Sequence, residues 1–99
     1  MPLPPQFRAA RALVGLSQAV IAEKAGVSPS MVKRAEGTAK PAAPEEAQRA
    51  IARALEAAGV IFIAENGGGA GVRLKFSRRE VKAIDTLENE GGPAREDDV

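Results

Sequence analysis

Residues Leu16–Gly37, LSQAVIAEKAGVSPSMVKRAEG, are the most informative part of this 99-residue chain. It holds two helix starts built on the same local pattern. Ser17 and Ser28 are of the residue type that accepts a hydrogen bond from the free backbone N–H groups of a helix's first turn. Pro29 follows at the first helical position, where its missing N–H costs nothing. The stretch therefore predicts two short helices.

Apolar residues flank both starts. Leu16 can pack on Ile21 and Val27 on Val32, the spacing of a hydrophobic staple, and Gly26 allows a sharp turn between the helices. The residues expected to face inward are Ile21 and Ala22 from the first helix and Val32 and Ala35 from the second. Two short helices joined by a glycine turn are a helix-turn-helix, a motif that in DNA-binding proteins places its second helix in the major groove.

The second helix keeps one face without large apolar groups, formed by Pro29, Ser30, Lys33 and Arg34. That face is free to contact a ligand, although Lys33 and Arg34 could also form a merely solvated surface. Capping alone explains Pro29 and the serine before it. Glu36 is expected to make a structural bond or ion pair near the end of its helix.

The pattern resembles the Cro/phage-repressor type of helix-turn-helix, the XRE family, and within it small single-domain bacterial regulators. The matching residues are Leu16-Ser17-Gln18, Ile21-Ala22, Ala25-Gly26-Val27-Ser28, Val32-Lys33-Arg34-Ala35-Glu36-Gly37, Ala57-Ala58-Gly59-Val60 and the glycine-rich segment from Glu65 to Leu74. The likeness covers about residues 6–75. Two departures are Pro29, where many relatives carry a polar base-reading residue, and the segment after Phe76, which has no assigned counterpart.

The resemblance implies a dimeric transcriptional regulator that binds double-stranded DNA. It implies that Gln18 touches backbone phosphate and braces the recognition helix, about residues 28–36. Basic side chains supply phosphate contacts, whereas base reading falls to few residues, with Pro29 offering an apolar edge to a thymine methyl. The candidate DNA-binding residues are Ser17, Gln18, Ser28, Pro29, Ser30, Lys33, Arg34 and Lys40. So sparse a set predicts modest specificity per half-site and hence a symmetric dimer.

The charge is divided along the chain. Residues 1–41 carry six basic and two acidic residues, a net +4, whereas residues 84–99 carry six acids and one base, a net −5. A polyanion is drawn to the first part and repels the second. Arg8 and Arg11 are expected to be plain surface charge. With no His and no Cys, the usual proton shuttle, the strongest nucleophile and thiolate metal sites are absent, so neither an enzyme nor a cofactor is expected.

Two further helices are expected. The first runs from about Gln6 to Val14, with Phe7, Ala10 and either Leu13 or Val14 buried, and ends at Gly15. After the loop Thr38–Pro44, a second begins at Glu45-Glu46 and ends at Gly59. Its apolar stripe is Ala47, Ala50, Ile51, Ala54, Leu55 and Ala58.

A β-hairpin should follow, with Val60–Ile63 as its first strand and Val72, Leu74 and Phe76 alternating in the second. The run NGGGAG between them is expected to be a flexible loop and not a phosphate cradle. Three successive apolar residues in the first strand imply cover on both sides, for which a second subunit is a source. The expected dimerisation residues are Ile61, Phe62, Ile63, Val72 and Leu74.

Ser77–Glu80 forms a capping box that predicts a last helix, residues 78–88, packing on the hairpin, on its twofold mate or on another protein. The expected organisation is a helix-turn-helix domain at 1–59, a dimerisation extension at 60–88 and a disordered acidic tail at 89–99. The fold class is mainly α: four to five helices in a repressor-like domain with a C-terminal hairpin and short last helix. With no signal peptide or membrane span, a cytoplasmic protein is expected. An antitoxin-like or adaptor-like protein-interaction module, gripping its partner through the C-terminal segment, is the alternative.

Overall fold

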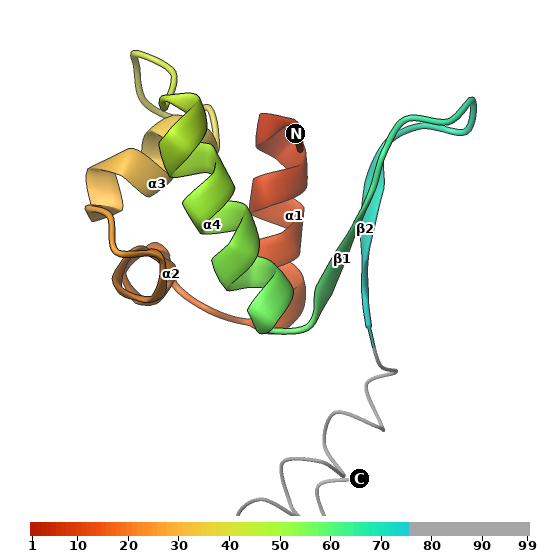
Figure 1. Ribbon diagram of the computed structural model, residues 1–99, viewed down its shortest axis with the longest axis horizontal. Coiled ribbons are helices and arrows are strands. Elements are labelled where there is room, and N and C mark those ends of the chain that lie inside the picture. The colour runs from red at the N-terminus through yellow and green to blue at the C-terminus, as the bar shows by residue number, and fades with distance from the viewer. Residues whose placement is uncertain (76–99) are drawn as a thin grey trace, which may run out of the picture.

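A computed structural model describes residues 1–75, in which four α-helices precede a two-stranded antiparallel hairpin (Figure 1). The elements are α1 (Pro4–Val14), α2 (Gln18–Ala25), α3 (Pro29–Ala35), α4 (Glu45–Ala57), β1 (Val60–Ile63) and β2 (Gly71–Leu74). The mainly α fold with a terminal hairpin is confirmed. The helix expected at 78–88 and the acidic segment 89–99 lie outside the described residues.

Helix α1 begins two residues before the expected start. Pro4 occupies its first position, and the Gln6 side chain accepts a hydrogen bond of 2.7 Å from the backbone N–H of Leu3. At its other end Gly15 adopts the left-handed conformation, with φ 69°. Val14 packs against the core and Leu13 is exposed, which decides between the two alternatives for the buried face.

The core lies where the four helices meet, and small side chains let them approach closely. Its buried members are Phe7, Ala10, Ile21, Ala22, Val32, Ala35, Ala43, Ala47, Ile51, Ala52, Leu55 and Val60. The inward-facing residues expected of α2 and α3 are all among them. In α4 the stripe is confirmed at four positions, whereas Ala50 is half-buried and Ala58 is exposed. Ala52 is buried in addition, so the core covers a wider face of α4 than the stripe predicts.

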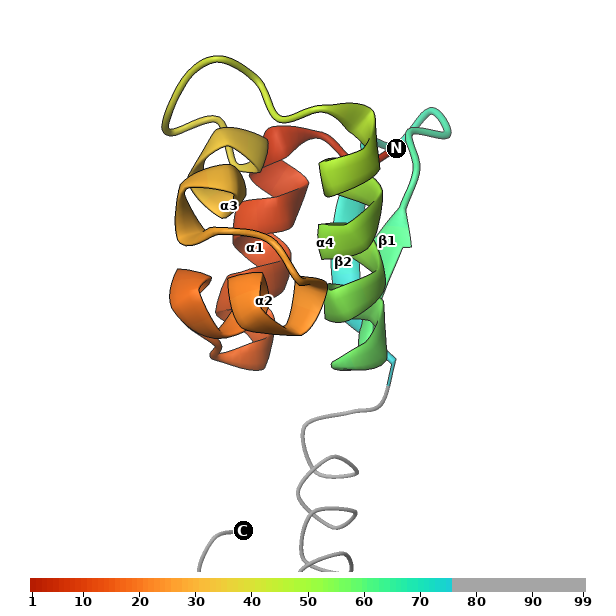
Figure 2. The ribbon, with the colours of Figure 1, turned by 60° about the vertical axis from the view of Figure 1, so that its left-hand side comes forward.

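The hairpin has two different faces. Its register pairs Val60 with Leu74 and Phe62 with Val72, so these four side chains share one face. That face packs on the domain: Phe62 meets the ring of Phe7 edge to face, with centroids 5.9 Å apart. In Figure 1 the hairpin lies on the far side of α4 and α1 from α2 and α3. Figure 2 shows β2 behind α4, with the glycine-rich tip projecting beyond the helices.

Candidate nucleic-acid interface

The turn between α2 and α3 has the predicted local geometry. The Oγ atom of Ser17 accepts a hydrogen bond from Val20 N, and that of Ser28 accepts one from Met31 N, each 3.1 Å long. Gly26 takes the left-handed conformation with φ 75°. Both predicted caps and the turn are therefore confirmed, and each hydroxyl is engaged with its own helix.

The outward face of α3 is formed by Pro29, Ser30 and Lys33, all of which are exposed. The Lys33 ammonium makes no hydrogen bond or ion pair with any residue of the described part of the chain. The opposite face is buried through Val32 and Ala35. Helix α3 thus presents a short, polar, singly charged surface to the solvent.

Arg34 serves a different purpose from Lys33. Its guanidinium is half-buried and donates hydrogen bonds to the carbonyl oxygens of Pro41 and Ala42, at 2.7 and 3.3 Å. These bonds hold the loop after α3 against that helix. Lys40 lies in this loop with its side chain exposed, so Arg34 positions Lys40. The structure brings Lys33 and Lys40 to one end of α3, whereas Arg34 is occupied by carbonyl groups.

Glu36, directly after α3, is the centre of a buried polar network. Its carboxylate accepts hydrogen bonds from Arg11 Nε at 2.7 Å, Arg11 Nη2 at 3.2 Å and Gln18 Nε2 at 2.9 Å. Its backbone carbonyl accepts another from Arg8 Nη1. The structural role expected of Glu36 is confirmed. The expectation that Arg8 and Arg11 are plain surface charge is wrong, because both reach across from α1 to hold this residue.

The network joins three helices. Arg11 Nη1 also donates to the carbonyl of Leu16, 3.3 Å away, in the link between α1 and α2. The pKa of Arg11 is raised, first by its hydrogen bond to Glu36 and further by the attraction of that carboxylate, against the opposing effect of burial. The buried carboxylate of Glu36 thus has a permanently charged partner.

Gln18 lies in the first turn of α2 and bonds to Glu36, beyond the last turn of α3. The bracing role that the resemblance implied is thus observed. The contact places the start of α2 at the C-terminal end of α3. Ser28 caps the other end of α3, about 12 Å from Glu36 along the helix axis at 1.5 Å per residue.

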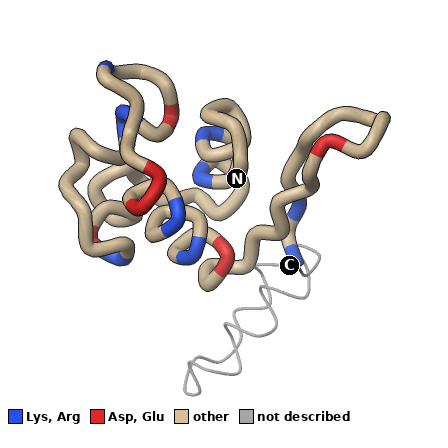
Figure 3. The backbone as a smooth tube through the Cα atoms, turned by 45° about the horizontal axis from the view of Figure 1, so that its top comes forward, with Lys and Arg blue, Asp and Glu red and all other residues tan. Residues whose placement is uncertain are grey.

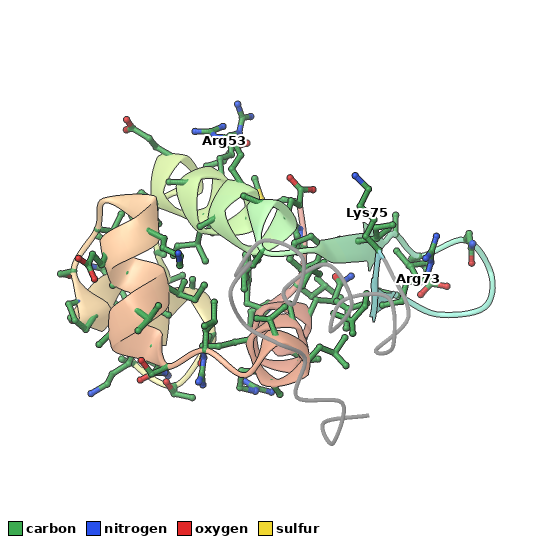
Figure 4. All side chains as sticks on the ribbon, turned by 90° about the horizontal axis from the view of Figure 1, so that it is seen from below. Arg53, Arg73 and Lys75 are labelled. Carbon is green, nitrogen blue, oxygen red and sulfur yellow. The ribbon has the colours of Figure 1, made fainter. Side chains whose placement is uncertain are left out.

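The expected dimerisation residues divide between the two faces of the hairpin. Phe62 and Val72 pack against the chain's own core, and Leu74 lies on their face. Ile61 and Ile63 lie on the opposite face and are half-buried. Figure 4 shows Arg73 extending from β2, Lys75 from the position after its last residue, and Arg53 from α4. Of the five expected dimerisation residues, Ile61 and Ile63 are the two on the face opposite Phe62 and Val72.

The glycine-rich tip has no free cradle for phosphate. Glu65 Oε2 accepts hydrogen bonds from the N–H groups of Gly67 and Gly69, each 3.1 Å long, and Asn66 Oδ1 accepts one from Gly68 N at 3.2 Å. Three amides that could bind an anion are already occupied. The tip is a hairpin loop organised by its own side chains.

Gln6 is a structural residue that sequence reasoning missed. It is buried, and its Nε2 donates to the carbonyls of Ile63 and Gly71, at 3.1 and 2.9 Å. These two residues are the last pair of the hairpin ladder before the loop. Gln6 therefore ties the start of α1 to the hairpin. The sequence signals this role only in that Gln6 is a polar residue beside Phe7, on a helix face that is otherwise apolar.

Within residues 1–75 no three acidic side chains gather in a way that could hold a metal ion. In the same part of the chain, no helix has the length and apolar character needed to cross a membrane. Figure 3 shows basic positions on all four helices and in the loop after α3, with acidic positions beside them on α2 and α4.

Comparison with known proteins agrees with this geometry. A family model described as "Helix-turn-helix domain" matches residues 6–60, which run from α1 to the first residue of β1. No curated protein matches the chain. Helix-turn-helix domains are typical of regulators that bind DNA and are not enzymes. Since the match covers more than half of the sequence, the chain belongs to the helix-turn-helix domain family.

Proposed function

We propose that this protein is a sequence-specific, DNA-binding transcriptional regulator of the Cro/phage-repressor (XRE) type, acting as a homodimer in the cytoplasm. The observation that carries the proposal is the outward face of α3. Pro29, Ser30 and Lys33 are exposed on a helix whose opposite face is buried and whose end is held through Glu36 by two other helices. A rigid, exposed helix of this kind suits the major groove.

The side chains divide the recognition between bases and phosphates. We assign hydrogen bonds with base edges to Ser30 and Lys33, and contact with a thymine methyl to the apolar ring of Pro29. Lys40 supplies charge to the phosphate backbone from the loop that Arg34 holds. We assign the second contact with the phosphate backbone of DNA to Ser17 and Gln18, at the start of α2. Ser28, which caps the start of α3, enters the groove.

Because each subunit makes few base contacts, a dimer is needed to discriminate between DNA sequences. Two copies related by a twofold axis read half-sites one helical turn apart, about 34 Å. The hairpin face carrying Ile61 and Ile63 lies away from α3, so pairing there leaves both recognition helices free (Figure 1). An isolated two-stranded hairpin is marginally stable in water, and a second hairpin would stabilise it.

Selection of bound sequences from a random pool of DNA duplexes tests the whole proposal. Enrichment of an inverted repeat supports specificity, symmetry and partner together. Fluorescence anisotropy on the enriched site at two salt concentrations should then show weaker binding at higher salt. If no duplex binds even at low salt, the protein is not a regulator of this type, and the adaptor function takes its place.

A further inference from the structure

The tip of the hairpin, which projects beyond the helices in Figure 2, contains the dipeptide Asn66-Gly67. All residues from 65 to 69 are exposed. Because glycine has no Cβ, its backbone nitrogen can approach the side-chain amide carbon of the preceding asparagine with little hindrance. The other asparagine of the chain, Asn89, precedes Glu90. Asn66 is therefore the asparagine more open to attack by the backbone that follows it.

The hydrogen bonds of the tip fall on the atoms that such an attack involves. Glu65 Oε2 accepts a hydrogen bond of 3.1 Å from Gly67 N, so a carboxylate oxygen lies beside the proton that this nitrogen must lose. A second bond to Oε2, from Gly69 N at 3.1 Å, holds the carboxylate in place. Gly68 N donates to Asn66 Oδ1 at 3.2 Å, which folds the side chain over the following backbone. That oxygen gains negative charge when the amide carbon is attacked, and it already has a donor.

We infer that Asn66 deamidates spontaneously in the folded protein, with Glu65 as the proton acceptor. In the first step Gly67 N forms a bond to Asn66 Cγ and its proton passes to the Glu65 carboxylate, while Gly68 N–H stabilises the oxyanion at Oδ1. The Cγ–Nδ2 bond then breaks, and Nδ2 takes the proton from Glu65 and leaves as ammonia. Solvent water opens the resulting succinimide ring by adding OH to one carbonyl carbon and H to the ring nitrogen. The products are aspartate and isoaspartate.

The reaction changes the tip of the hairpin. Both products carry a second carboxylate beside Glu65, and isoaspartate lengthens the backbone by one carbon. Gln6 holds the carbonyls of Ile63 and Gly71 at the base of the tip, so we expect the change to stay within residues 64–70. Because ammonia is lost to the solvent, the modified fraction should increase with the age of the protein. The inference does not depend on DNA binding.

Mass spectrometry of the full chain, incubated at neutral pH and then digested, measures the exchange of NH₂ for OH at each asparagine. Guanidinium chloride provides the first comparison, because the unfolded chain keeps the dipeptide and loses the hydrogen bonds of the tip. Asn66 should react at least about tenfold faster in the folded protein than in the unfolded one. In the folded sample it should also react faster than Asn89. Equal rates in either comparison would overturn the inference.

Two variants of the full chain test the part played by Glu65. Glu65→Gln keeps the size of the side chain and an acceptor oxygen but removes the negative charge, so it should slow the reaction of Asn66 about tenfold. Glu56→Gln makes the same charge change at an exposed position of α4 and should leave the rate unchanged. If Glu65→Gln reacts as fast as the unchanged protein, or if both variants are slowed equally, Glu65 is not the proton acceptor and the inference fails.

Discussion

Arg11 Nε lies 2.7 Å from Oε2 of Glu36, and this ion pair joins α1 to the end of the recognition helix. The carboxylate side chain is 2% exposed and the arginine 26%. A buried charge without its partner is costly, although the intact pair adds little net stability over an apolar replacement. The pair instead helps to fix the orientation of α3, because Gln18 and Arg8 also bind Glu36 from two other positions.

Replacing Arg11 with Met should lower the free energy of unfolding by about 3 kcal/mol, because the Glu36 carboxylate stays buried without its main partner. Urea denaturation measures the loss. The double variant Arg11→Met/Glu36→Met removes both charges and should lose markedly less than the sum of the single variants. Strictly additive losses would show that the two residues do not stabilise each other.

Lys33→Ala should weaken DNA binding while leaving the melting temperature almost unchanged, since the ammonium is exposed and bonds to no described residue. The preference for the selected duplex over a random duplex should also narrow, because Lys33 is proposed to contact a base edge. Anisotropy titrations with the selected and a random duplex measure this. A drop of many degrees in melting temperature would instead make Lys33 structural.

Gln6→Glu should loosen the hairpin. The new carboxylate still accepts the Leu3 N–H but cannot donate to the carbonyls of Ile63 and Gly71, and we expect a loss of about 2 kcal/mol. Amide hydrogen exchange should accelerate across residues 60–74 more than in α2. Gln6→Met keeps the length without adding charge and removes these two bonds together with the one from Leu3 N–H, and it should have the same pattern. Unchanged hairpin protection in both variants would refute the tie.

The two faces of β1 should respond differently to substitution. Ile61→Lys with Ile63→Lys should leave the fold intact and abolish the proposed dimer, because these side chains lie on the strand face opposite Phe62, which packs on the core. Phe62→Ala should cost about 3 kcal/mol of folding stability through the lost contact with Phe7. Sedimentation at high micromolar concentration and thermal melting separate the effects. If the unchanged protein sediments as one 10.3 kDa chain, the dimer proposal falls.

Gly37→Ala should destabilise the fold more than Gly26→Ala. Both glycines are left-handed, with φ 82° and 75°, so both variants incur about 1 kcal/mol of backbone strain. Only at Gly37 does an added Cβ approach another group, lying 3.2 Å from Pro4 Cβ, whereas nothing lies within 4 Å at Gly26. Chemical denaturation of both variants measures the difference. Equal losses would mean that Pro4 moves aside without cost.

The features predictable from the sequence were those set by neighbours within four residues. Ser17 and Ser28 cap their helices through N–H groups three positions away, and Gly26 turns the chain by its own conformation. Helix periodicity likewise predicted the core face of α2 and α3, and strand alternation predicted the hairpin. These interactions depend on local geometry, which a linear pattern records directly.

Tertiary structure alone decided the partners of the polar residues. Arg11 meets Glu36 across 25 positions of the sequence, and Gln6 meets Gly71 across 65. The identity of a hydrogen-bond donor in the sequence does not reveal which distant acceptor will lie beside it in the fold. For the same reason the sequence could not tell Lys33, which stays exposed, from Arg34, which is held by loop carbonyls. Three consecutive apolar residues in β1 predicted burial, and only packing on Phe7 showed which of them the domain itself covers.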